Sequence, residues 1–202
     1  MKYKIITGHN IQYKDIEDAI YLDSLSYKDC YRGKFKDCIN WYKANPDIYM
    51  MIKTSNQIIA YINVMPLYEK CYNKIKDGNF IDINIEPNMI MKYEKNNTYN
   101  IYLSSIVIHP DYQNGFILKI LFDAMFNKFI EMSKNKIFIK QILLDAVTVK
   151  GEKIAKFLGM KEVNKSLHNS KIYEVSMIPP EFKITTKLTK QLFDLYKGIK
   201  NV

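Results

Sequence analysis

Apolar residues follow two different periods along this chain, and the changes between them predict an alternating order of strands and helices. Alternation at every second residue, or a short apolar run between turn residues, predicts strands at 4–7, 49–53, 58–64, 100–109, 137–148, 160–167 and 172–177. Apolar positions three and four residues apart predict helices at 15–27, 35–44, 116–132 and 149–158. In the first helix, the stripe through Ile16 and Ala19 lies opposite acidic residues that include Asp15.

The stretch 100–132 is the most distinctive, because a strand, a short polar turn and a strongly apolar helix follow one another directly. Simple alternation predicts that Ile101, Leu103, Ser105 and Val107 face one side, and Tyr102, Ser104, Ile106 and Ile108 the other. Both faces are mostly apolar, which favours an interior strand covered on both sides. Pro110 ends the strand because proline cannot donate to the ladder. The strand-helix-strand order at 100–148 implies that its two strands pair in parallel.

Two regions carry weaker patterns. Residues 66–99 are irregular, with a turn at 77–79, a predicted strand at 80–85 and a short helix at 87–95. Four tyrosines there (Tyr68, Tyr72, Tyr93 and Tyr99) could line a pocket or lie at the surface. After Pro179 and Pro180, apolar residues at helical spacing predict a tail helix, which we expect to pack on its own domain, with a homodimer contact as the alternative. We therefore divide the chain into a domain at 1–178 and a helical extension at 179–202.

The composition is typical of a globular domain and argues against a membrane span, a metal site and nucleic-acid binding. The 202 residues are 48% hydrophobic, enough for one α/β domain with a substantial core. No stretch reaches the roughly 18 apolar residues of a membrane span, and no apolar signal core is visible, so we expect a cytoplasmic protein without membrane contact. Cys30, Cys38 and Cys71 are odd in number and lack metal-type spacing, so we expect free thiols and no metal. The net charge of +9 favours an anionic partner, but the lysines are dispersed, which argues against nucleic acid.

The turn at 111–115 is a candidate anion site. Backbone N–H groups at a helix start lack internal partners, and the helix dipole favours negative charge there. Only one glycine is present and no Gly-Lys-Ser/Thr follows, so neither the dinucleotide fingerprint nor the Walker loop is matched. Many strand-to-helix turns share this pattern, so the turn alone does not identify the ligand.

Two motifs resemble those of the Gcn5-related N-acetyltransferases, the GNAT superfamily. Ile108-His109-Pro110 followed by Gln113-Asn114-Gly115-Phe116-Ile117-Leu118 resembles the acyl-CoA motif Val-x-Pro and Gln/Arg-x-x-Gly-x-Gly/Ala, with at least one glycine lost. Residues 148–160, ending in Leu158-Gly159-Met160, resemble the next motif. The resemblance implies a mixed central sheet of about six to seven strands flanked by helices, and acetyl-CoA as acyl donor. It implies cofactor contacts from Ile106, Val107, Ile108, Gln113, Asn114, Gly115, Phe116, Ile117, Leu118 and Thr148.

The resemblance leaves the catalytic groups open. Ala155 stands where many members of the family carry a tyrosine that protonates the leaving thiolate. Instead of the family's usual glutamate, the central strand offers Ser105, which could order a water, and the adjacent strand offers Asp145, which could accept a proton or be structural. The implied function is transfer of an acetyl group to a primary amine of a small molecule or peptide. The alternative is a catalytically degenerate module that binds CoA or another anion as a sensor or interaction protein.

Overall fold

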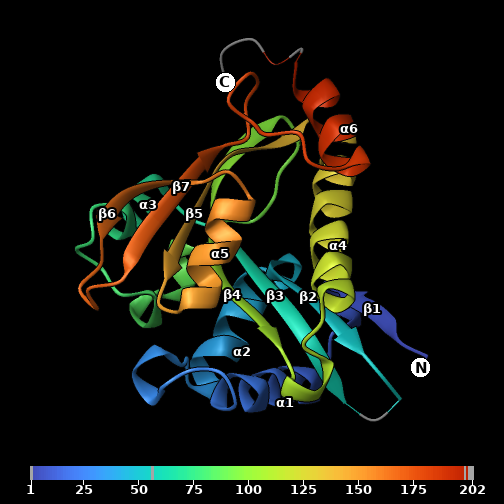
Figure 1. Ribbon diagram of the computed structural model, residues 1–202, viewed down its shortest axis with the longest axis vertical. Coiled ribbons are helices and arrows are strands. Elements are labelled where there is room, and N and C mark those ends of the chain that lie inside the picture. The colour runs from blue at the N-terminus through green and yellow to red at the C-terminus, as the bar shows by residue number, and fades with distance from the viewer. Residues whose placement is uncertain (1, 56, 198, 200–202) are drawn as a thin grey trace.

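The computed structural model describes residues 2–55, 57–197 and 199, and its centre is a seven-stranded sheet (Figure 1). The strands lie in the order β1-β2-β3-β4-β5-β7-β6. All neighbours are antiparallel except β4 and β5, which are parallel, as the strand-helix-strand order predicts. Because β4 lies between β3 and β5, it is an interior strand, which confirms the interpretation of its two apolar faces.

The N-terminal half follows the sequence pattern closely. β1 (Lys4–Thr7) leads to α1 (Tyr13–Ser24) and α2 (Phe35–Ala44), and the hairpin of β2 (Tyr49–Lys53) and β3 (Ile58–Pro66) comes next. One expectation is wrong: Asp15 is 1% exposed, not on a solvated face. Its carboxylate receives the Gln12 N–H at 2.9 Å as part of a capping box, and the Lys53 Nζ at 2.5 Å. A helix cap with its own ion pair explains why this acidic residue is buried.

The segment between β3 and β4 differs most from expectation. It contains a helix that the sequence reading missed, α3 (Glu69–Lys76). The predicted strand at 80–85 is wrong, because this part forms the 3₁₀ turn Asp82–Asn84. The predicted helix at 87–95 is also wrong beyond the 3₁₀ turn Pro87–Met89. Trp41 Nε1 donates to the Ile85 carbonyl at 2.6 Å, and Tyr72 and Tyr99 are buried, so tertiary packing sets this conformation.

The C-terminal half is built from β4 (Asn97–Ile108), α4 (Gly115–Lys134), β5 (Ile137–Ala146), α5 (Val149–Phe157) and the hairpin of β6 (Lys161–Lys165) and β7 (Lys171–Ser176). Gly159 adopts φ +74 directly after α5, a left-handed conformation that favours glycine. These elements confirm the predicted order, with boundaries shifted by a few residues.

A bulge in β4 corrects the predicted faces of that strand. Ser105 pairs with Asn63 but Leu103 pairs with Val64, so Ser104 is an extra residue without a partner on β3. An extra residue reverses the alternation beyond it. Leu103 accordingly packs in the core beneath α4, whereas Val107 packs in the core on the opposite side of the sheet. Simple alternation had placed these two residues on the same face.

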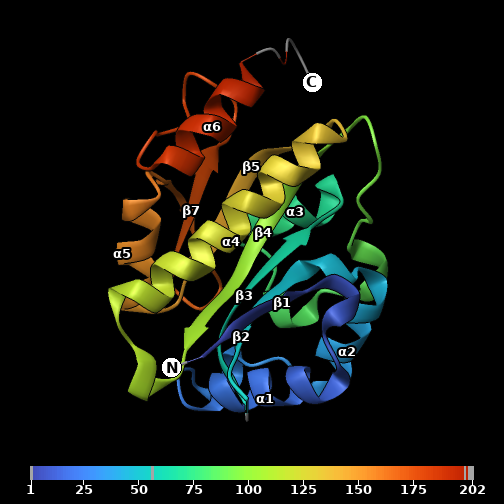
Figure 2. The same cartoon turned by 90° about the vertical axis from the view of Figure 1, so that its right-hand side faces the viewer.

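The sheet separates two hydrophobic cores. α1, α2 and α3 cover one face, and α4, α5 and α6 (Lys187–Tyr196) cover the other (Figure 2). Leu192 and Tyr196 of α6 are buried in the second core, where the Tyr196 hydroxyl accepts the Ile139 N–H at 3.0 Å. The tail helix therefore contacts the sheet and α4 of its own chain. None of the described helices combines the length and the apolar character that crossing a membrane requires.

The packing of α6 predicts a contrast between two leucines of the same helix. Leu192→Ala should lower the free energy of unfolding by about 2–5 kcal/mol, because Leu192 is fully buried. Leu195→Ala should change it by less than about 0.5 kcal/mol, because Leu195 is 42% exposed. Urea unfolding of both variants measures this, and equally small effects would show that residues 179–202 are not part of the folded domain.

Candidate functional site

β4 and β5 separate at their carboxyl ends, and this separation creates the main cavity. Their parallel pairing ends at Tyr102 and Leu143, after which β4 continues along β3 and β5 along β7. The two arrows diverge in Figure 1, with α5 beside the gap. A cavity of about 700 Å³ lies here, lined by residues 103–108 of β4, 144 and 145 of β5, 113–115 and 118 at the start of α4, 147–151, 153 and 154 around α5, and 25–27 after α1.

The edge of β4 that faces the gap carries free main-chain groups. The Ile106 carbonyl accepts from the Tyr27 hydroxyl at 3.5 Å, and the Ile108 carbonyl accepts from Gln113 Nε2 at 3.1 Å. These side chains occupy positions where a neighbouring strand would otherwise bind. A residue's N–H and C=O leave a strand on the same side, so the N–H groups of Ile106 and Ile108 also face the gap. They can donate to a ligand carbonyl.

The start of α4 offers fewer free amides than its sequence suggests. The Asn114 side chain caps the helix by accepting the Ile117 N–H at 3.0 Å, and the Asn114 carbonyl accepts the Leu118 N–H at 3.4 Å. Gln113 and Asn114 N–H groups donate to Pro110 and Tyr112 carbonyls. Within the described chain, only the N–H groups of Gly115 and Phe116 at this turn have no acceptor. The main-chain donors that this turn can offer to an anion are therefore these two amides.

The side chains of this turn leave the helix start open. A Cβ added at Gly115 would meet nothing within 4 Å, so a ligand can approach the backbone there. Phe116 turns away from the cavity, and its ring lies 6.4 Å from that of Tyr3. Ile117 is buried in the core, while Leu118 lines the cavity. Of the predicted contact residues, Phe116 and Ile117 are thus the two that do not line it.

A polar bridge links the two loops on either side of the gap. Lys150 Nζ lies 2.6 Å from Gln113 Oε1, and Lys153 also lines the cavity. Thr148, a predicted cofactor contact, caps α5 by accepting the Gly151 N–H at 3.0 Å, which leaves its hydroxyl proton available to a ligand. Two ammonium groups and two free amides therefore lie around this opening, an arrangement that suits an anion such as a diphosphate.

The two predicted catalytic residues both line the cavity, on different strands. Ser105 lies beside the bulge of β4, and Asp145 lies near the end of β5. The Asp145 carboxylate accepts from the Ser170 hydroxyl at 2.6 Å. Partial burial raises the pKa of Asp145, although its serine hydrogen bonds oppose the shift. A carboxylate with a raised pKa in a cavity is a better proton acceptor than a solvated one.

Sequence reasoning missed two further carboxylates on the α1 side of the sheet. Asp82 accepts from the Tyr102 hydroxyl at 3.1 Å and the Ser104 hydroxyl at 3.5 Å, and burial raises its pKa to about 6. Asp23 accepts from the Tyr61 hydroxyl, and burial raises its pKa to about 7. No linear motif marks them, because α1, the 3₁₀ turn Asp82–Asn84 and β4 are distant in the sequence and come together only in the fold. Among the described residues, no group of three or more His, Cys, Asp or Glu side chains is placed to hold a metal ion.

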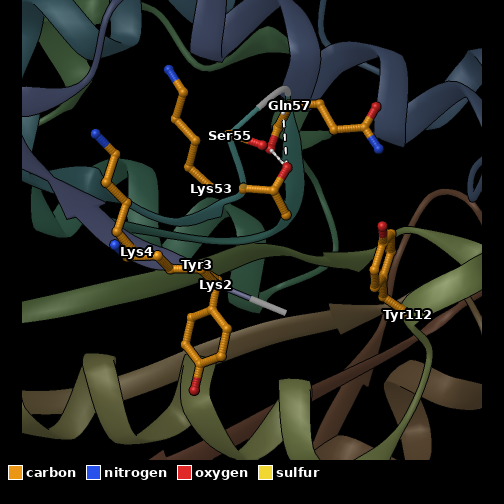
Figure 3. Close-up of a pocket in the computed structure, with 8 residues that line it drawn as sticks. Lys2, Tyr3, Lys4, Lys53, Ser55, Gln57 and Tyr112 are labelled. Atoms are coloured by element: carbon orange, nitrogen blue, oxygen red, sulfur yellow. Dashed lines mark hydrogen bonds between the residues drawn. The ribbon is translucent and has the colours of Figure 1, made fainter.

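A second cavity, of about 610 Å³, lies between β1, the β2–β3 turn and Tyr112. Figure 3 shows the Lys4 and Lys53 side chains extending away from Tyr112, so their charges do not converge on one point. Lys53 already forms an ion pair with Asp15. This cavity has no carboxylate among its described lining residues, and we take the gap between β4 and β5 as the functional site.

Several solved structures have a fold similar to that of this chain. The loading GNATL domain of CurA from Lyngbya majuscula matches with a TM-score of 0.62 at 12% identity, over 86% of this chain and 97% of that one. Naa50 from Arabidopsis thaliana, in complex with the bisubstrate analogue CoA-Ac-MVNAL, matches with a TM-score of 0.53 at 10% identity, over 86% of this chain and 98% of that one. An N-acetyltransferase from Staphylococcus aureus Mu50 matches with a TM-score of 0.51 at 12% identity, over 87% of this chain and 99% of that one. The chain has the fold of the GNAT N-acetyltransferases.

The GNAT fold confirms the predicted fold class, including a mixed sheet within the expected six to seven strands. The sequence matches no protein-family model and no curated protein. The likeness is therefore one of fold.

The buried Asp23 predicts an unusual dependence of stability on pH. Its pKa is about 7 in the folded chain, against about 3.9 for an ordinary Asp, so between these values the folded state holds a proton that the unfolded state has lost. This contribution to stability is complete below pH 4 and is lost as pH rises through 7. From pH 5 to pH 7.5, the free energy of unfolding should therefore fall less for Asp23→Asn than for wild type. The difference should be on the order of 2 kcal/mol.

Urea unfolding at the two pH values measures this difference. Glu17→Gln, which removes an exposed carboxylate from the same helix, is the matched control and should follow wild type. If the Asp23→Asn curve ran parallel to wild type, Asp23 would not be a buried, proton-binding carboxyl.

Proposed function

We propose that this protein is an N-acetyltransferase that moves an acetyl group from acetyl-CoA to a primary amine of a small molecule or peptide. The observation that carries the proposal is the single cavity that reaches from the free amides of α4, along the open edge of β4, to Asp145. An acyl-CoA needs anion binding at one end and a proton acceptor near its thioester at the other. The Arabidopsis Naa50 structure, which holds a bisubstrate analogue containing CoA, supports the same cofactor class on this fold.

In this proposal the gap holds the cofactor in three parts. The diphosphate binds the N–H groups of Gly115 and Phe116, helped by the Lys150 ammonium. The pantetheine arm lies along residues 106–108, with Thr148 on its other side. The N–H groups of Ile106 and Ile108 are directed to the gap, where one can polarise the thioester carbonyl.

The transfer needs no reagent besides acetyl-CoA and the amine. Asp145 takes one proton from the acceptor ammonium, directly or through a water ordered by Ser105, and the amine nitrogen forms a bond to the acetyl carbon. The carbon–sulfur bond then breaks, its electron pair leaves on sulfur, and the thiolate takes one of the two remaining N–H protons, while the other stays on the amide product. Ala155 is fully buried and cannot supply that proton, but a thiol with a pKa of about 8.5 is a tolerable leaving group.

The alternative, a module that binds CoA without catalysis, is favoured by one observation: the position of the family's acidic tyrosine is occupied by the buried Ala155. Release of free thiol from acetyl-CoA in the presence of an amine distinguishes the two functions, since a binding module releases none.

Acetyl-CoA should stabilise the folded chain. At a concentration a hundred times its Kd, binding adds about 2.7 kcal/mol, which for a domain of this size raises Tm by about 5–10 °C. Differential scanning fluorimetry measures the shift. No shift at millimolar acetyl-CoA would contradict cofactor binding and with it the proposed function.

Lys150 should contribute to phosphate binding specifically. Lys150→Ala should weaken CoA binding on the order of ten-fold, because a charged hydrogen bond to the diphosphate is lost, and should leave the binding of pantetheine, which has no diphosphate, unchanged. Isothermal titration calorimetry with both ligands measures this. Lys156→Ala is the control, since Lys156 is exposed on the same helix and does not line the cavity. Equal CoA affinities for the two variants would place the diphosphate elsewhere.

A further inference from the structure

Two side chains bind the open edge of β4, and their hydrogen bonds differ in strength. Gln113 Nε2 donates to the Ile108 carbonyl at 3.1 Å, while the oxygen of the same amide accepts from Lys150. The Tyr27 hydroxyl lies 3.5 Å from the Ile106 carbonyl. Hydroxyl donors usually lie about 2.5–3.0 Å from their acceptor, so this second bond is long and weak. Of the two groups, the Tyr27 hydroxyl can therefore turn to a ligand with the smaller loss.

The ring of Tyr27 is held in place while its residue lines the cavity. The main-chain N–H of Tyr27 donates to the Asp23 carbonyl at 2.8 Å, just beyond the end of α1. The ring packs against the core on the α1 side of the sheet. Leu25, Ser26 and Tyr27 all contribute to the cavity between β4 and β5. Because packing already restricts this side chain, little conformational freedom is lost when its hydroxyl binds a ligand.

The Tyr27 hydroxyl stays protonated in the neutral range. Burial raises the pKa of Tyr27, and the nearby Asp23 carboxyl raises it further, although the hydrogen bond to the Ile106 carbonyl opposes the shift. An un-ionised phenol donates one hydrogen bond and cannot act as a strong base. The group at this point of the cavity is therefore a hydrogen-bond donor.

Strand geometry places this donor beside the N–H group of Ile106. The N–H and the C=O of Ile106 both face the gap. Where a neighbouring antiparallel strand pairs with such a residue, one partner residue donates to its C=O and accepts from its N–H. The Tyr27 hydroxyl takes the place of that partner's N–H. A ligand oxygen on the Ile106 N–H would take the place of the same partner's carbonyl, so the hydroxyl and the ligand oxygen would be neighbours.

We propose that Tyr27 is the second donor to the thioester carbonyl, acting together with the Ile106 N–H. This inference rests on the proposed function, because it assigns a residue of the same site. Without ligand the hydroxyl donates to the Ile106 carbonyl. When the thioester oxygen binds the Ile106 N–H, the hydroxyl turns to that oxygen. Its hydrogen bond strengthens as attack by the amine places negative charge there, and the proton remains on Tyr27.

Infrared spectroscopy of bound acetyl-CoA, labelled with carbon-13 at its carbonyl, tests the inference without any amine. Tyr27→Phe, which keeps the ring and removes the donor, should raise the carbonyl stretching frequency above that of the wild-type complex. Tyr27→3-fluorotyrosine, which has nearly the same shape and is a stronger donor, should lower it. Tyr21→Phe removes an exposed hydroxyl from α1 and should match wild type.

Kinetics provide a second readout with any primary amine that wild type acetylates. Tyr27→Phe should lower kcat on the order of 100-fold, because one of two donors to the developing oxyanion is lost. The KM for acetyl-CoA should change by less than about two-fold, since the lost interaction is strongest in the transition state. A lower kcat with an unchanged carbonyl frequency would mean that Tyr27 acts only through the structure, which overturns the inference.

The outcomes separate this inference from the function on which it rests. Each protein is first tested for the acetyl-CoA shift in Tm. If wild type shows no shift, the proposed function fails and the inference fails with it. If acetyl-CoA binds but Tyr27→Phe and the 3-fluorotyrosine variant share the wild-type carbonyl frequency, the inference is overturned and cofactor binding stands. If Tyr27→Phe does not fold, the 3-fluorotyrosine variant decides, and a frequency that is not lowered overturns the inference.

Discussion

The separation of β4 from β5 after Tyr102 and Leu143 is the constraint on which the site depends. Up to that point the strands satisfy one another's main-chain groups, and beyond it each keeps only its outer neighbour, β3 or β7. An unpaired strand edge inside a protein needs other partners. Tyr27 and Gln113 supply two of them, and the groups that remain are available to a ligand.

The bulge at Ser104 adds a second consequence of the same geometry. Because β4 carries one residue more than β3 at this point, its polar pair Ser104 and Ser105 lies on the α1 side of the sheet, toward Asp82. The apolar residues Ile106 and Ile108 then return to the α4 side. One side of the gap is thus bounded by free amides and lysines, and the other by Asp145, with Asp82 behind Ser104. This division suits a reaction between an anionic donor and a cationic acceptor.

Much of this fold could be predicted from the sequence, because most elements carry a regular period. β1, β2 and α2 have the predicted bounds, and the turn before α4 was located from Pro110 and Gly115. The segment between β3 and β4 could not be predicted, since its conformation depends on distant contacts such as that of Trp41 with Ile85. The role of Asp82 could not be predicted for the same reason. Its hydrogen-bond donors, Tyr102 and Ser104, are twenty and twenty-two residues away in the sequence.

A crystal structure of the protein with acetyl-CoA tests the central claim most directly. The account predicts the diphosphate within hydrogen-bond distance of the Gly115 and Phe116 N–H groups, and the sulfur in the gap between Ser105 and Asp145. A cofactor bound elsewhere on the chain, or a gap closed by pairing of β4 with β5 along their full length, would contradict it.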